Sequence, residues 1–159
     1  MSAARRGWLR AIGLGAIVLA LDQVTKQIVA AQVAAGERVD LVLGFQLADV
    51  RNKGVAFGFF GEGEGLLIVI TAAALALVLA FFARDPARPG LWVGVGLLIG
   101  GAIGNLADRV RDGSVIDFID PPHYPTFNLA DVAIVVGIAI VVLIQLGSGE
   151  DEPTPRAEG

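Results

Sequence analysis

The chain has 159 residues, of which 55% are hydrophobic and only 18% are charged, and its mean hydropathy is +0.69. Soluble domains carry more charge, so this composition excludes an ordinary water-soluble protein and predicts one polytopic membrane domain. Most of the net charge of −4 arises from a short acidic segment at the C-terminus, and the dispersed basic residues exclude a nucleic-acid-binding stripe.

Four apolar stretches follow one another along the chain, each close to the roughly 20 residues that a bilayer requires. They cover about 8–35, 66–82, 91–107 and 129–146. We therefore predict an α-helical polytopic membrane protein with four transmembrane helices. The first helix is expected to remain uncleaved, because Asp22 and Lys26 interrupt its apolar run and three further spans follow.

Basic residues predict the orientation of these spans. Three arginines precede the first span, and Arg84 and Arg88 lie in the short turn between the second and the third. Cytoplasmic loops are enriched in such residues, so both termini are expected to be cytoplasmic. Segments 36–65 and 108–128 then lie outside.

The first external segment contains two patterns that differ from the spans. Residues 37–47 alternate between polar and apolar side chains, which predicts short β-strands. Residues 52–60 are rich in phenylalanine, which predicts a loop lying at the membrane interface. Beyond the fourth span, the polar residues 147–159 are predicted to be disordered.

The tetrapeptide Asn-Leu-Ala-Asp occurs twice, at 105–108 closing the third span and at 128–131 opening the fourth. An ionisable residue at the end of a membrane-length apolar run usually marks a functional site. Counting about 1.5 Å per helical residue also places Asp22 on the outer side of the midplane. Asp117 lies in the loop that joins the last two spans. Four carboxylates are therefore expected to gather at the outer interface.

Neighbouring residues divide these carboxylates into two kinds. Asp22 has Lys26 four residues later, on the same helix face, and Asp108 is followed by Arg109. Charge compensation is the simpler interpretation of both. Asp117 and Asp131 have apolar neighbours and no adjacent base, so they form an uncompensated pair.

An uncompensated pair of carboxylates in a partly dry site cannot easily ionise twice, so the two groups share a proton near neutrality. One can then act as a base toward water while the other acts as an acid toward an amide carbonyl. The charges also permit structural roles. Asp131 or Asn128 could cap the fourth helix, and Asp117 could be an ordinary loop acid.

Two other classes of function fit the same residues. In a small ion-coupled carrier or channel component, the carboxylates would relay protons or cations. In a structural membrane protein, the acids would only pair with Lys26, Arg109 and Arg111. Without cysteine and with a single histidine, the chain has no thiol nucleophile and no multi-histidine metal site.

Five motifs occur in order along the chain: Asp22-Gln23-x-x-Lys26, Asn52-x-Gly54-x-Ala56-Phe57, Gly101-x-x-Gly104-Asn105-x-x-Asp108-Arg109, Val115-Ile116-Asp117-Phe118 and Phe127-Asn128-x-Ala130-Asp131. Together they resemble the motifs of the lipoprotein signal peptidase family, the type II signal peptidases of bacteria. The resemblance extends from about residue 8 to residue 146. It implies four transmembrane helices with a small extracytoplasmic β-cradle and an interfacial loop.

The resemblance also implies an activity. An intramembrane aspartic endopeptidase would cleave diacylglyceryl-modified prolipoproteins on the amino side of the lipidated cysteine. The catalytic pair would be Asp117 and Asp131. The supporting residues would be Asn52, Gly54, Asn105, Arg109, Asn128, Asp22, Lys26 and Asp108.

The expected setting follows from the same family. We expect a monomer in the bacterial inner membrane, with the active site near the outer face. Its partners would be lipid-modified prolipoproteins and membrane lipid, with no nucleic acid. No metal and no organic cofactor are implied.

Overall fold

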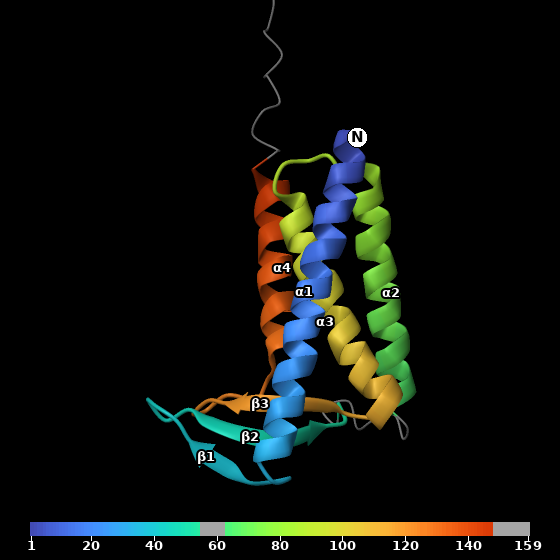
Figure 1. Cartoon of the computed structure of the whole chain (residues 1–159). Helices are drawn as coiled ribbons and strands as arrows, with labels where there is room; N and C mark the ends of the chain where they lie inside the picture. Colours follow the sequence, from blue (N-terminus) through green and yellow to red (C-terminus); the bar gives the residue numbers. More distant parts are fainter. Residues whose placement is uncertain (55–62, 148–159) are drawn as a thin grey trace, which may run out of the picture.

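The computed structural model describes residues 1–54 and 63–147. These residues form four helices, α1 (Ala3–Gln32), α2 (Gly63–Arg84), α3 (Leu91–Asp112) and α4 (Leu129–Leu146). All four are long and apolar enough to cross a membrane, which confirms the predicted fold class of a multi-pass helical membrane protein. A small sheet lies across the end of the bundle that is remote from the N-terminus (Figure 1).

Local capping explains where the helices depart from the predicted spans. Helix α1 begins earlier, at Ala3, because the Ser2 hydroxyl accepts the Arg5 main-chain N–H at 3.3 Å and caps it. Helix α3 continues to Asp112 and ends at Gly113, whose φ of +67° and bond to the Arg109 carbonyl close the last turn. Residues 108–112 are therefore helical and continue α3 beyond the predicted end of the third span at residue 107.

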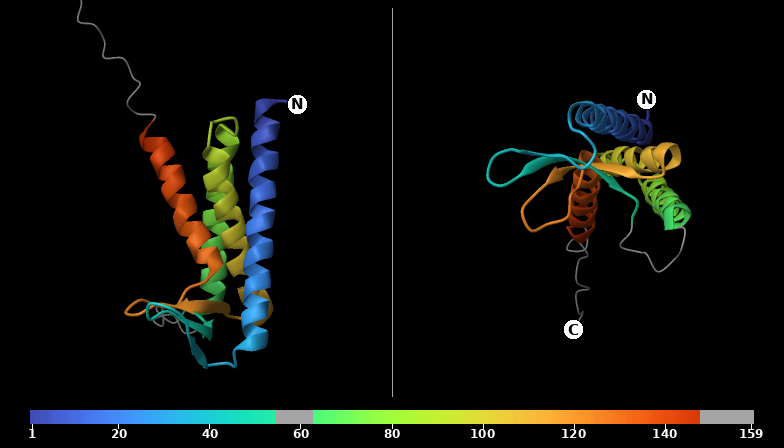
Figure 2. Two further views of the ribbon diagram at one scale, coloured as in Figure 1. Left: turned by 60° about the vertical axis from the view of Figure 1, so that its left-hand side comes forward. Right: turned by 90° about the horizontal axis from the view of Figure 1, so that it is seen from below.

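The sheet contains β1 (Arg38–Asp40), β2 (Gln46–Asn52) and β3 (Val115–Asp120), antiparallel and in that order. It extends sideways beyond the helices (Figure 2). Strands were predicted within 37–47, but β2 continues to Asn52. Strand β3 occupies part of the loop that was predicted between the third and fourth spans. Residues 55–60 of the predicted interfacial loop and the predicted disordered tail beyond 147 lie outside the described residues.

Glycines on α3 allow two other helices to approach its backbone closely. A Cβ atom added at Gly100 would lie 2.6 Å from the Gly15 carbonyl oxygen of α1. One added at Gly101 would lie 2.5 Å from the Ala130 carbonyl oxygen of α4. Close approach through small residues is how membrane helices gain packing energy without a hydrophobic driving force. Helix α3 therefore forms the centre of the bundle.

The buried face of helix α1 forms one continuous stripe. Its buried residues recur every three or four positions, the spacing of a single helix face. The stripe consists of Gly7, Ala11, Gly15, Val18, Asp22, Lys26 and Val29. Two charged residues thus continue an otherwise apolar contact surface and must find partners inside the bundle.

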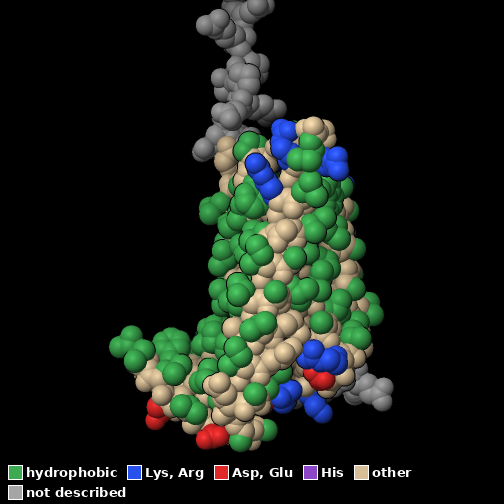
Figure 3. Space-filling model, viewed as in Figure 1, with side chains coloured by type: hydrophobic (Ala, Val, Ile, Leu, Met, Phe, Trp, Pro, Cys, Tyr) green, Lys and Arg blue, Asp and Glu red, His purple; other side chains and the backbone are tan. Residues whose placement is uncertain are grey.

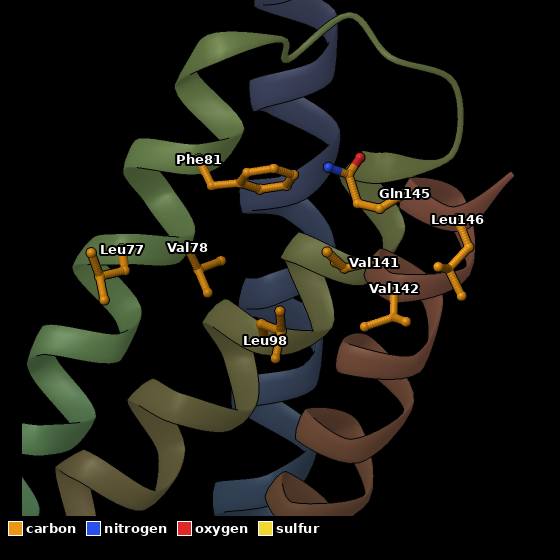
Figure 4. Close-up of a pocket in the computed structure, with 8 residues that line it drawn as sticks. All are labelled: Leu77, Val78, Phe81, Leu98, Val141, Val142, Gln145 and Leu146. Carbon is orange, nitrogen blue, oxygen red and sulfur yellow. The ribbon is translucent and has the colours of Figure 1, made fainter. Parts of the chain in front are cut away.

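Helices α2 and α4 leave an apolar cavity of about 380 Å³ between them. Phe81 and Gln145 extend toward one another from the two helices, and Leu98 of α3 lies between the helices (Figure 4). Leu77 and Leu146 at its edges are largely exposed, so the cavity opens toward the surrounding lipid.

We predict that Gly100→Ala destabilises the bundle by about 1–3 kcal/mol, because the added methyl group would collide with the α1 backbone and with Val18. Thermal unfolding in detergent measures the effect. Gly13→Ala is the matched control on α1, since a Cβ at Gly13 meets no atom within 4 Å. Equal melting temperatures for the two variants would contradict the close contact.

Candidate active site

Asp117 is held in a buried position by the register of the sheet. Asn52 at the end of β2 pairs with Val115, so its side chain lies on the same face of the sheet as that of Asp117. The Asn52 Nδ2 donates to Asp117 Oδ2 at 2.8 Å. Only 2% of Asp117 is exposed. Asp117 was predicted to lie in a loop, and β3 corrects that placement.

Gly54 fixes which end of the Asn52 amide faces Asp117. Its main-chain N–H donates to Asn52 Oδ1 at 2.8 Å, which turns the NH2 group toward the carboxylate. Gly54 has φ +73°, and a Cβ atom there would lie 2.1 Å from a methyl carbon of Leu67 on α2. The backbone conformation therefore favours glycine, and any larger residue would also displace the Leu67 side chain.

Asp131 lies in the first turn of α4, where it closes a capping box with Asn128. The Asn128 side chain accepts the Asp131 N–H at 3.0 Å, and Asp131 Oδ2 accepts the Asn128 N–H at 3.1 Å. Asn128 is thus the N-cap, while Asp131 both caps and remains half-buried. Its Oδ1 accepts a bond of 2.8 Å from the Asn105 amide.

Asn128 joins the two aspartates. Its side-chain Nδ2 donates to Asp117 Oδ1 at 2.7 Å, while its main-chain N–H donates to Asp131. The same Nδ2 donates to Asn105 Oδ1 at 3.1 Å. Asn105 and Asn128, the first residues of the two Asn-Leu-Ala-Asp copies, therefore touch each other as well as the acids.

A charged cluster lies on the other side of Asn105. Lys26 Nζ is 2.8 Å from Asp22 Oδ2, which confirms the predicted i, i+4 pair, and 2.8 Å from Asp108 Oδ2. It also donates to Asn105 Oδ1 at 3.0 Å. All three charged side chains are at most 1% exposed. The predicted pairing of Asp108 with Arg109 was wrong, because adjacent residues on a helix do not face each other.

Gln23 and two arginines complete this cluster. Gln23 Nε2 donates to Asp108 Oδ1 at 2.9 Å, and Arg111 lies 3.4 Å from the same oxygen. Neither was selected from the sequence as a site residue, although Gln23 belongs to the first motif. Arg109 Nη1 donates to the Asn105 carbonyl at 3.3 Å, and among the described residues it bonds neither aspartate of the pair.

Asp117 and Asp131 are the uncompensated pair that the sequence predicted. Within residues 1–54 and 63–147, neither forms an ion pair with a lysine or arginine. Burial raises the pKa of Asp117 to about 6, and the negative charge of Asp131 acts in the same direction. The Asn52 bond, the Asn128 bond and the charge of Lys26 partly oppose that rise.

The arrangement can perform acid and base chemistry beside an apolar pocket. A cavity of about 230 Å³ adjoins Asp131 and is otherwise lined by Tyr124, Phe127 and three valines of α4. Among the described residues, no three His, Cys, Asp or Glu side chains are grouped to hold a metal ion. Two carboxyl groups held in this way can transfer protons to and from a bound substrate.

Comparison with known proteins gives the family of the chain. The family model described as "Signal peptidase (SPase) II" matches residues 14–146. The chain belongs to the signal peptidase II family. Membership implies a protease, and it favours the enzyme over the carrier and the structural interpretations.

Relatives in the signal peptidase II family match almost end to end. A lipoprotein signal peptidase of Nitratidesulfovibrio vulgaris (strain DP4) is 37% identical over 151 residues, covering 87% of this chain and 92% of the relative. The lipoprotein signal peptidase of Oleidesulfovibrio alaskensis is 42% identical over 82% of this chain and 90% of the relative.

Solved structures agree with this assignment. Two structures of bacterial membrane enzymes superpose with TM-scores of 0.80 and 0.81, at 30% and 28% identity. The alignments cover 89% and 93% of this chain and 94% of each solved chain. The four-helix bundle and its sheet are therefore an arrangement shared with experimentally determined enzymes.

We predict that Asp117→Asn makes stability less sensitive to pH. Because the folded state holds the Asp117 proton up to about pH 6, the unmodified chain loses stability as pH rises from the normal carboxyl range through that value. Relative to the unmodified chain, the variant should gain up to about 3 kcal/mol between pH 4 and pH 7.5. Thermal unfolding across this range measures the difference.

Asp120→Asn is the control on the same strand. Its bond to Arg38 lowers the pKa of Asp120, so its stabilisation is present at neutral pH and is lost as pH falls. The two variants should thus change with pH in opposite directions. A pH-independent effect of Asp117→Asn would show that Asp117 titrates normally.

Proposed function

We propose that this chain is an intramembrane aspartic endopeptidase that cleaves diacylglyceryl-modified prolipoproteins on the amino side of the lipidated cysteine. Asp117 and Asp131 form the catalytic pair. The observation that carries the proposal is that both acids are joined through Asn128 and neither has a basic partner among the described residues. Relatives named lipoprotein signal peptidase support the substrate.

The surroundings of the two acids favour different starting states. Asp117 is buried and retains a proton up to about pH 6, its pKa there, so it is assigned as the acid. Asp131 accepts two N–H donors at the N-terminus of α4, where the helix dipole favours a negative charge, so it is assigned as the base. Substrate binding removes water and strengthens this difference.

The proposed reaction proceeds in two steps. Asp131 takes a proton from a water molecule whose oxygen attacks the scissile carbonyl carbon, while Asp117 gives its proton to the carbonyl oxygen. In the second step the C–N bond breaks, Asp131 passes its proton to the leaving nitrogen, and a hydroxyl of the intermediate returns a proton to Asp117. The pair ends in its starting state.

The apolar pocket beside Asp131 supports a substrate that carries lipid. Val132, Val135 and Val136 line it, and their partly exposed side chains face outward from α4. A diacylglyceryl group on the cysteine could remain in a membrane-like environment there while the adjacent peptide bond meets the aspartates. Water and lipid must both reach such a site, as they do at a membrane interface.

The distribution of charge supports an orientation with both termini in the cytoplasm. Arginines gather at the end of the bundle that holds the N-terminus, whereas the sheet end carries both signs (Figure 3). Basic loops remain on the cytoplasmic side. The sheet and the aspartates then lie at the outer face of the bacterial inner membrane, where signal peptides are exposed after export.

We expect Asp117→Asn and Asp131→Asn each to reduce cleavage of a lipidated precursor by about 10²–10⁴-fold, because each removes one half of the proton transfer. The double variant should cleave about as fast as the less active of the two single variants, because the acids act as a unit. Rates are measured with purified protein in detergent. Asp120→Asn on the same strand is the control and should keep normal activity. Substantial cleavage by Asp117→Asn would contradict the assignment of Asp117 as a catalytic residue.

We expect a synthetic precursor peptide bearing diacylglyceryl cysteine to be cleaved far faster than the unmodified peptide. Val135→Phe, which narrows the pocket, should raise KM for the lipidated peptide several-fold. The control is Leu143→Phe, an exposed position on the same helix that does not line the pocket. Equal rates for the two peptides would argue against lipid recognition, and unchanged KM in Val135→Phe would argue against this pocket.

A further inference from the structure

A polar cavity lies at the end of the bundle opposite the aspartates. It has a volume of about 300 Å³ and is formed by the first turns of α1 and by the turn between α2 and α3. Arg6, Arg10, Arg88 and Trp92 line it together with the small and proline residues of that turn. Blue side chains mark this end of the molecule, near the N-terminus (Figure 3).

The walls of this cavity are held by specific contacts. A Cβ atom at Gly7 would lie 1.8 Å from the Pro86 carbonyl oxygen, so glycine lets α1 touch the turn. Next to it, Trp8 packs edge-on against Phe82 of α2, with ring centroids 4.7 Å apart. Arg88 bonds the Gln145 side chain and the Ile144 carbonyl of α4. All four helices therefore fix the position of the cavity.

The charged side chains that line the cavity are all basic. Its lining residues include three arginines and no carboxylate, and Asp85 of the same turn is not among them. Arg6 bonds the Met1 carbonyl, and Arg10 lies 5.8 Å from the Trp92 ring centroid. Among the described residues neither Arg6 nor Arg10 forms an ion pair. Four residues apart on α1, they share a helix face.

We propose that this cavity binds the headgroup phosphate of an anionic phospholipid. Basic pockets between transmembrane helices at the cytoplasmic side suit such headgroups, and an interfacial tryptophan lies at headgroup depth. A lipid fits better than free phosphate because exposed apolar residues, Ile12 and Ile17, follow Arg10 along α1 toward the middle of the bundle. Arg6 and Arg10 provide the charge, and Trp92 borders the site.

Quenching of Trp92 by brominated lipid tests the proposal. The chain contains two tryptophans, so Trp8→Phe leaves Trp92 as the single reporter. The full chain is placed in phosphatidylcholine vesicles that contain either brominated phosphatidylglycerol or brominated phosphatidylcholine. We expect quenching by phosphatidylglycerol to saturate at a low mole fraction. Each variant is compared by the ratio of the two quenching curves, which cancels changes in intrinsic fluorescence.

Matched variants separate a defined site from general attraction to the surface. Each arginine near an anionic membrane contributes about five-fold, so Arg6→Gln with Arg10→Gln should weaken phosphatidylglycerol preference about 25-fold. Arg5→Gln with Arg84→Gln changes the same charge at the same end without lining the cavity, and it should have a much smaller effect. Equal losses in the two double variants would overturn the proposal.

Two other occupants are distinguished in the same assay. Displacement of brominated phosphatidylglycerol by inorganic phosphate would identify a free-phosphate site instead. The second alternative is tested with a chain that ends at Gly147. If only this shortened chain prefers phosphatidylglycerol, the acidic C-terminal residues occupy the cavity in the full chain. We expect neither result, and either one would overturn the assignment to lipid.

Discussion

The contact of Lys26 with Asp22 and Asp108 is the interaction on which the site depends. These side chains come from α1 and α3, and Asp22 also accepts the Ala130 N–H of α4 at 3.0 Å. One buried cation thus ties three helices together at the depth of the active site. Desolvating such charges offsets much of their attraction, so their main contribution is to specify one arrangement. A displaced α1 would take Lys26 away from the buried Asp108 and Asp22 away from the Ala130 N–H, which is costly enough to disfavour alternative packings.

Asparagine amides carry this arrangement from the charged cluster to the aspartates. Asn105 accepts from Lys26 with its oxygen and donates to Asp131 with its nitrogen. Its orientation is therefore set by the lysine, because reversing the amide would place a donor against an ammonium group. Asn52 is set in the same manner by the Gly54 N–H before it donates to Asp117. Each acid thus faces an amide donor whose orientation is set by a hydrogen bond to a further residue, Lys26 for Asn105 and Gly54 for Asn52.

Sequence alone predicted the features that depend on local spacing. The four spans follow from apolar runs, the Asp22–Lys26 pair from helical geometry, and the uncompensated pair from neighbouring residues. Strand β3 was missed because Val115, Ile116 and Phe118 are all buried, so no alternation reveals a half-exposed strand. The partner of Asp108 was missed because Lys26 lies on another helix. Contacts such as Asn52 with Asp117, 65 residues apart, require the tertiary fold, and only the family motifs pointed to them.

The two Asn-Leu-Ala-Asp copies acquire different roles because one lies within α3 and the other opens α4. In the first copy, the buried face of α3 directs Asp108 to Lys26, which compensates its charge. In the second, the first turn of α4 directs Asp131 to N–H donors, and its charge is stabilised without a cation. This difference matters chemically, since a lysine or arginine against the pair would favour two ionised carboxylates and remove the shared proton. Neutral amides orient the acids and leave one of them able to hold that proton. A layer of asparagines between the cation and the aspartates is therefore what lets a charged anchor and a proton-sharing pair coexist in one bundle.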